Sequence, residues 1–96
     1  MRRYTIPRGE DVANLNAALL LVLDHSTVGR PTRQRIARTL KINGLANATQ
    51  KALVLRSVPL RCHAEIRAAL DEEGRQLYTL VLVRAGELLR QPPGVL

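Results

Sequence analysis

Residues 77–83 read Leu-Tyr-Thr-Leu-Val-Leu-Val, and this stretch decides the fold class expected for the 96-residue chain. It is rich in strand-forming residues, and it follows Gly74, after which the helical spacing of apolar residues changes to an extended one. Residues 84–87 then predict a turn, and residues 88–90 can return antiparallel to 77–83. The sequence therefore predicts a C-terminal β-hairpin, with a frayed tail over 91–96.

Apolar residues upstream of the hairpin recur at helical spacing. Val12, Leu15, Leu19 and Val22 lie three or four residues apart, which places them on one stripe of a helix over 11–24. Three further leucines widen the stripe: Leu20, Leu21 and Leu23. A helix that is apolar around most of its circumference is buried on two sides. This helix is therefore either central in the domain or half of a dimer interface.

Turn and capping residues predict three more helices. A glycine and a proline within 29–31 end one element and open a second helix, which is expected to run to about residue 42. Residues 47–50 have the form of a capping box, so a third helix starts there and stops before the next proline. A fourth helix starts within 57–59, and Gly74 is expected to end it in the left-handed conformation.

The composition is that of one small globular domain over residues 1–96, in which 1–9 form a short extended segment. Hydrophobic residues make up 46% of the chain and are interleaved with charge, and the length leaves no room for a second core. Cys62 is the only cysteine, which excludes a disulfide framework and a cysteine-based zinc site. The longest apolar run, 17–23, is too short to span a bilayer and is wrongly flanked for a signal peptide. We therefore expect a cytoplasmic protein with no membrane partner.

The net charge of +7 is concentrated in the middle of the sequence. No acidic residue occurs between Asp24 and Glu65, while this stretch carries eight basic residues: Arg30, Arg33, Arg35, Arg38, Lys41, Lys51, Arg56 and Arg61. Such a field attracts a polyanion. Only Tyr4 and Tyr78 are aromatic, which disfavours modules that stack single-stranded bases on aromatic rings. Duplex DNA is the expected partner.

The segment 32–42, Thr-Arg-Gln-Arg-Ile-Ala-Arg-Thr-Leu-Lys-Ile, resembles the first helix of bacterial helix-turn-helix motifs. There, a threonine or serine cap precedes an Ile-Ala pair, and the small Ala37 would allow the two helices of the motif to cross closely. Helices followed by a hairpin are similar in order to a winged helix-turn-helix domain, and the pattern covers 32–90. Two features depart from it: Lys41 stands where a glycine is usual, and the next helix begins later. The resemblance implies a mostly α fold of about four helices plus a C-terminal β-hairpin wing.

The expected DNA contacts fall on three helices and on the wing. Phosphate docking is assigned to Arg33, Arg35, Arg38, Lys51 and Arg56, and Lys41 is expected among the DNA-binding residues. The start of the third helix offers Asn47, Thr49 and Gln50 for base edges, and the start of the fourth offers Arg61 and Arg67. The third helix is favoured as the reader because it lies wholly within the acid-free stretch. Arg84, at the hairpin tip, is the expected wing residue.

Catalysis finds no support in the sequence. No phosphate loop appears, no nucleophile has an evident base, and adjacent Cys62 and His63 lack a third metal ligand. His25 is expected at a helix end, where it interacts with the negative end of the dipole. We expect a DNA-binding regulator that is not an enzyme, has no cofactor, metal or small-molecule substrate, and forms a homodimer through its first helix. The alternative is a helical adaptor that binds another protein through that leucine-rich helix.

Overall fold

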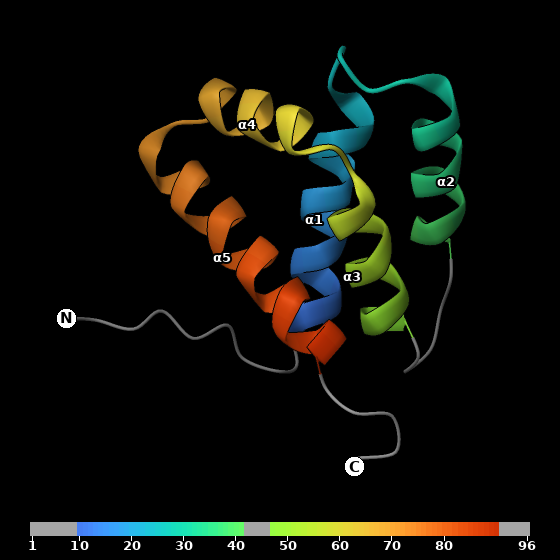
Figure 1. The fold of residues 1–96 in the computed structure, drawn as a ribbon. Coiled ribbons are helices and arrows are strands. Elements are labelled where there is room, and N and C mark those ends of the chain that lie inside the picture. The colour runs from blue at the N-terminus through green and yellow to red at the C-terminus, as the bar shows by residue number, and fades with distance from the viewer. Residues whose placement is uncertain (1–9, 42–46, 91–96) are drawn as a thin grey trace, which may run out of the picture.

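The computed structural model describes residues 10–41 and 47–90, which contain five helices (Figure 1). Their bounds are α1 (Asp11–Asp24), α2 (Arg30–Leu40), α3 (Asn47–Ser57), α4 (Leu60–Ala69) and α5 (Glu72–Arg90). The expected helix over 11–24 is confirmed, and the third helix begins and ends where the capping and proline signals place it. The extended segment expected over 1–9, the end of the second helix expected near residue 42 and the tail over 91–96 lie outside the described residues.

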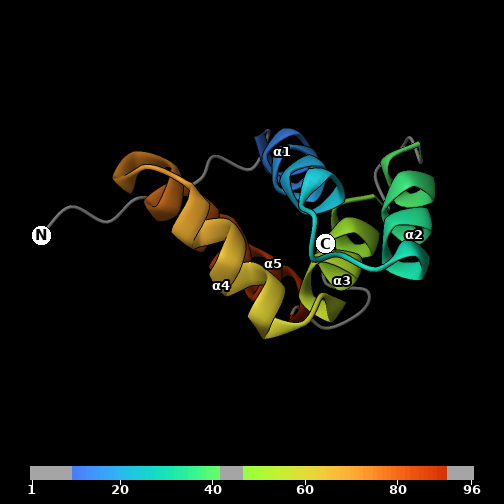
Figure 2. The ribbon, with the colours of Figure 1, turned by 90° about the horizontal axis from the view of Figure 1, so that it is seen from above.

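Helices α1 and α3 form a central pair, and the other helices lie on either side of it. Figures 1 and 2 both show α2 on one side of α1 and α3, and the connected pair α4 and α5 on the other. Among the described residues α2 packs on α1 and α3 only, whereas α5 packs most extensively on α3. The resulting body is flat, with extents of 38 × 37 × 18 Å.

The core is aliphatic and lies between α1, α3 and α5. From α1 it takes Leu15, Leu19 and Val22, which confirms most of the expected stripe, although Val12 at its start is 36% exposed. The other helices add buried side chains to the same cluster: Ile36, Ala52, Val54, Leu55, Ile66, Tyr78, Val81 and Ala85.

The predicted C-terminal β-hairpin, and with it the wing, is wrong. The described residues contain no strand, and 77–83 lies in the middle of the 19-residue helix α5. Tyr78, Val81 and Ala85 recur at spacings of three and four and are all buried on the inner side of this helix. A continuous apolar run can be a strand or a buried helix, and here packing against α3 selects the helix.

The predicted end of the fourth helix is also wrong. Helix α4 ends at Ala69, and Leu70 has extended backbone angles (φ −92°, ψ 156°). Gly74 is the third residue of α5, and its N–H donates to Oδ1 of Asp71 at 2.7 Å. Asp71 thus caps α5, with Glu72 and Glu73 in its first turn, where negative charge is favoured.

Candidate nucleic-acid interface

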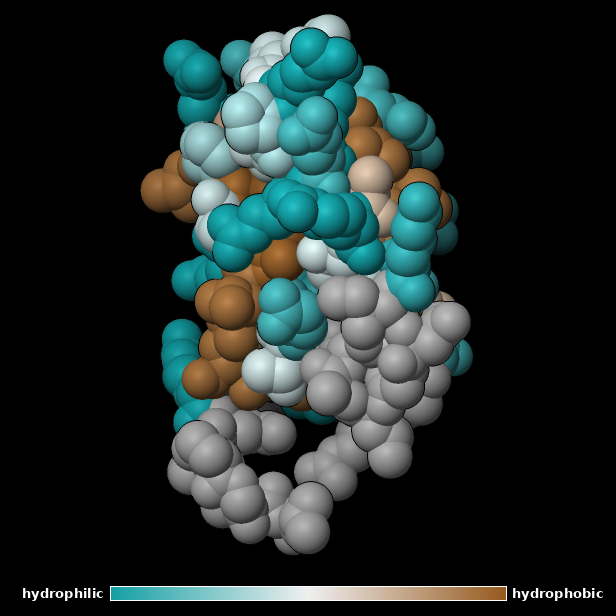
Figure 3. Space-filling model, turned by 90° about the vertical axis from the view of Figure 1, so that its right-hand side faces the viewer, coloured by the Kyte–Doolittle hydropathy of each residue, from teal (hydrophilic) through white to brown (hydrophobic). Residues whose placement is uncertain are grey.

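Helix α2 presents the densest group of exposed positive charges in the described chain. The group, here called the α2 face, consists of Arg30, Arg33, Arg35, Arg38 and Lys41, all of which are exposed. The opposite side of the helix carries buried Ile36 and Thr39, so the basic side chains are directed to solvent. Figure 3 views this side of the molecule, where hydrophilic side chains dominate the upper and middle part.

The cations of the α2 face are not neutralised by neighbouring carboxylates. Within residues 10–41 and 47–90, both ion pairs that the structure contains involve Arg84. Among the side chains of the α2 face, Arg33 also serves the fold, because its Nη2 donates to the carbonyl of His25 at 3.4 Å, at the end of α1. A helix of this length extends about 16 Å, long enough for its side chains to reach several successive phosphates of a duplex.

Arg30, which is part of the α2 face, and Gln34, which is exposed beside it, were not among the predicted DNA contacts. Arg30, Gln34 and Arg38 follow one another at intervals of four residues, which places them on one stripe of the helix. Gln34, Ala37 and Arg38 line a shallow hollow of about 340 Å³ on this side. The four-residue spacing within 30–38 was the signal in the sequence that could have identified them.

Helix α3 packs on both α2 and α5 and carries a narrow exposed stripe of its own. Thr49 and Gln50 are exposed in the first turn of α3, the next helix after α2 in the chain (Figure 1). The stripe continues through Leu53, which is 47% exposed, to Arg56. Asn47 begins α3, but its side chain lies outside the described part of the structure.

Lys51, predicted to contact DNA, is the most deeply buried charged side chain described. It is 1% exposed, and its Nζ donates to Oδ1 of Asn16 on α1. Burial lowers the pKa of this amine. Lys51 therefore belongs to the contact between α1 and α3, because it falls on the inward side of a helix that is buried on two sides.

Arg84 does not sit at a hairpin tip. It lies within α5, where Nε and Nη2 donate to the two carboxylate oxygens of Asp11 at 3.1 and 3.0 Å, and Nη1 donates to Glu87 at 3.1 Å. The hydrogen bond to Asp11 raises the pKa of the guanidinium. This two-pronged pair joins the first turn of α1 to α5, so Arg84 acts within the fold.

The remaining predicted arginines lie away from α2, on the side of α4 and α5. Arg56 and Arg61 are exposed and Arg67 is half-buried. The guanidinium carbon of Arg56 lies over Gly86 of α5. It is 4.0 Å from the position that a Cβ atom would take at this glycine. The predicted set is therefore divided between two sides of the molecule.

His63 forms a buried hydrogen-bond network that the sequence did not indicate. Its Nε2 is 3.0 Å from the carbonyl oxygen of Leu55, which can only accept, and its Nδ1 is 2.6 Å from the hydroxyl of Tyr78. The neutral ring therefore donates from Nε2 and accepts at Nδ1. Within residues 10–41 and 47–90, no group of three or more metal-ligating side chains lies together.

Two leucines of α1 remain on the surface. Leu20 is 48% and Leu21 40% exposed, so the fold of one chain does not bury them. The homodimer through this helix stays a prediction. None of the described helices has the length and apolar character needed to cross a membrane.

The arrangement of α2 and α3 gives the helix-turn-helix resemblance no added support. In Figures 1 and 2 the two helices run side by side in opposite directions, whereas helix-turn-helix motifs cross at about 90–120°. Ala37, expected at a close helix crossing, is half-buried and lines the hollow on the α2 face. No protein-family model matches the chain, and neither the curated proteins nor the solved structures yielded a similar protein.

Proposed function

We propose that the protein binds duplex DNA through the α2 face. The observation that carries this proposal is five exposed cations, four on helix α2 and one at its C-terminal cap, none of which is ion-paired within the described residues. Phosphates supply the charge that such a surface lacks, and arginine forks suit phosphate oxygens. Binding here occupies DNA by electrostatic docking, without chemistry on it.

Sequence preference would come from Gln34 on α2, and from Thr49 and Gln50 at the start of α3. Gln34 lies between two arginines on the same stripe, so phosphate contacts on both sides would hold its amide near the duplex. An amide can form two hydrogen bonds with adenine in the major groove. This places the α2 face, rather than α3 alone, at the centre of recognition.

The proposal predicts binding that weakens steeply with salt. If about five phosphates are neutralised, log affinity should fall with log salt at a slope of about −4 to −5. Arg38→Ala should weaken binding to every sequence alike and reduce the slope by about one, because a phosphate contact carries no sequence information. Fluorescence polarisation of a labelled duplex over a salt series measures both quantities.

Arg90→Ala is the matched control, since Arg90 is exposed near the end of α5 and outside the α2 face. It should leave the slope nearly unchanged. A wild-type slope near zero, or equal losses for Arg38→Ala and Arg90→Ala, would contradict the proposal. Gln34→Ala separates recognition from docking: it should cost about 1–3 kcal/mol on a preferred sequence and little on others.

A further inference from the structure

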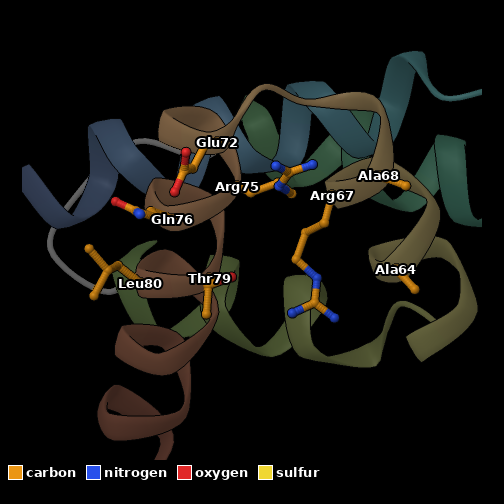
Figure 4. A pocket seen from close by; sticks show the side chains of 8 residues that line it. All are labelled: Ala64, Arg67, Ala68, Glu72, Arg75, Gln76, Thr79 and Leu80. Carbon is orange, nitrogen blue, oxygen red and sulfur yellow. The ribbon is translucent and has the colours of Figure 1, made fainter.

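A second basic surface lies between α4 and α5, in a groove of about 820 Å³ that we call the α4–α5 groove. Arg67 of α4 and Arg75 of α5 both line it, and Figure 4 shows their side chains in the space between the two helices. Ala64 and Ala68 line the α4 side, where their small side chains leave the groove open. The groove therefore offers two guanidinium groups from different helices to one ligand.

Positive charge exceeds negative charge in this groove, because two arginines and one glutamate line it. Neither Arg67 nor Arg75 forms an ion pair within the described residues, although Glu72 lines the same groove. Gln76 and Thr79 add an amide and a hydroxyl that can donate hydrogen bonds. Guanidinium groups with neutral donors beside them are suited to the oxygens of a phosphodiester.

A third arginine is close to the same side. Arg56 lies over Gly86 of α5, and its charge, like that of Arg67, lowers the pKa of the buried His63. Arg56 therefore adds a positive charge from α3 at its contact with α5.

Helices α4 and α5, whose residues line the groove, lie on the opposite side of α1 and α3 from helix α2 (Figures 1 and 2). Helix α2 makes no contact with α4 or α5 among the described residues. DNA has a persistence length of about 50 nm, so a duplex of about 20 base pairs is too stiff to bend around the molecule and cover both surfaces. Two separate segments are required to occupy them.

We propose that the α4–α5 groove is a second phosphate-binding site, which lets one chain bridge two duplex segments. The proposal rests on duplex binding by the α2 face for its bridging part, and the groove is testable separately. Arg67 and Arg75 hold the second phosphate backbone, and Gln76 and Thr79 add hydrogen bonds. No base reading is assigned to this surface.

The bridging test uses the full chain, a biotinylated duplex of about 20 base pairs on beads and a fluorescent copy in solution. Wild-type protein should retain the fluorescent copy on the beads. The double variant Arg67→Gln/Arg75→Gln should lose most of this retention while keeping its affinity for a single duplex within about twofold, because the α2 face is intact. Arg90→Gln should bridge as wild type does, and circular dichroism checks that all variants fold.

Retention by the double variant equal to that of wild type would overturn the proposal, because it would show bridging through paired α2 faces. Single-duplex binding by wild type without bridging would overturn it as well. A nuclear magnetic resonance titration with the same duplex reports the two surfaces separately, through the amides of Ala64 and Ala68 for the groove and of Ala37 for the α2 face. Unshifted Ala64 and Ala68 overturn the groove site whatever α2 does, whereas an unshifted Ala37 alone overturns the α2 face.

Discussion

His63 shows how one buried side chain can link stability to pH. Both its ring nitrogens are used by Leu55 and Tyr78, and the ring is 3% exposed. Burial lowers the pKa of His63, the Leu55 carbonyl opposes this, and the charges of Arg67 and Arg56 lower it further. Burial likewise raises the pKa of the Tyr78 hydroxyl. The neutral network is therefore the stable form in the folded protein.

The lowered pKa of His63 predicts a loss of stability in mild acid. In the unfolded chain a histidine takes up its proton near pH 6.5, about its ordinary pKa, while His63 in the folded protein stays neutral to lower pH. The unfolded state then binds more protons, so the free energy of unfolding is highest above about pH 6.5 and falls as the pH drops through the folded pKa. Urea unfolding at about pH 7.5 and 5.5 measures this difference.

His63→Gln provides the comparison for that measurement. It should cost about 1–3 kcal/mol at neutral pH, because buried hydrogen bonds to Tyr78 and Leu55 are weakened or lost. Its stability should then change less between the two pH values than that of wild type. His25 remains in both proteins and serves as the common background. An equal pH dependence of the two proteins would show that His63 is not the group responsible.

At the scale of the element, α5 contains two glycines in different surroundings. A methyl group at Gly86 would meet only the guanidinium carbon of Arg56 at 4.0 Å, an ordinary contact. At Gly74 it would lie 3.0 Å from Oδ1 of Asp71 and 3.3 Å from Cβ of Leu70. The first site has room for a side chain, whereas the second would disturb the carboxylate that caps the helix.

Alanine substitutions at these two positions should therefore differ. Gly86→Ala is expected to stabilise the protein by about 0.5–1 kcal/mol, since glycine inside a helix costs that much relative to alanine. Gly74→Ala should gain nothing or lose up to about 1 kcal/mol, because displacing Asp71 weakens the cap. Thermal unfolding of both variants measures the contrast. Equal stabilisation by the two would show that Asp71 does not cap α5 as described.

At the scale of the whole molecule, the ion pair of Asp11 and Arg84 joins two helices whose paired residues are 73 positions apart in the sequence. The Asp11 side chain is 7% and the Arg84 side chain 19% exposed, so this pair is better shielded from water than the exposed cations of the α2 face. It holds the first turn of α1 against α5, while the core between them is aliphatic. Removing one partner leaves a shielded charge without compensation.

Arg84→Gln should consequently destabilise the protein by about 3 kcal/mol, which urea unfolding measures. Its DNA-binding salt slope should stay that of wild type under conditions where the variant is folded, because Arg84 is engaged by Asp11 and Glu87. Arg90→Gln, an equal change of charge at an exposed site, should leave stability within about 0.5 kcal/mol. A reduced salt slope of the Arg84→Gln variant with unchanged stability would show that Arg84 contacts DNA.

The sequence by itself determined the distribution of charge, the helix over 11–24 and the start of α3. These follow from residue order alone: charge is a sum over neighbours in the chain, and capping and apolar spacing act within a few residues. Tertiary structure decided that 77–83 is helical, because burial of Tyr78 and Val81 against α3 outweighs local strand preference. It also decided which cations face solvent. Lys51 donates a hydrogen bond to Asn16, 35 positions away, and Arg84 donates to Asp11, 73 positions away. Packing of the helices determines which of such distant residues become partners.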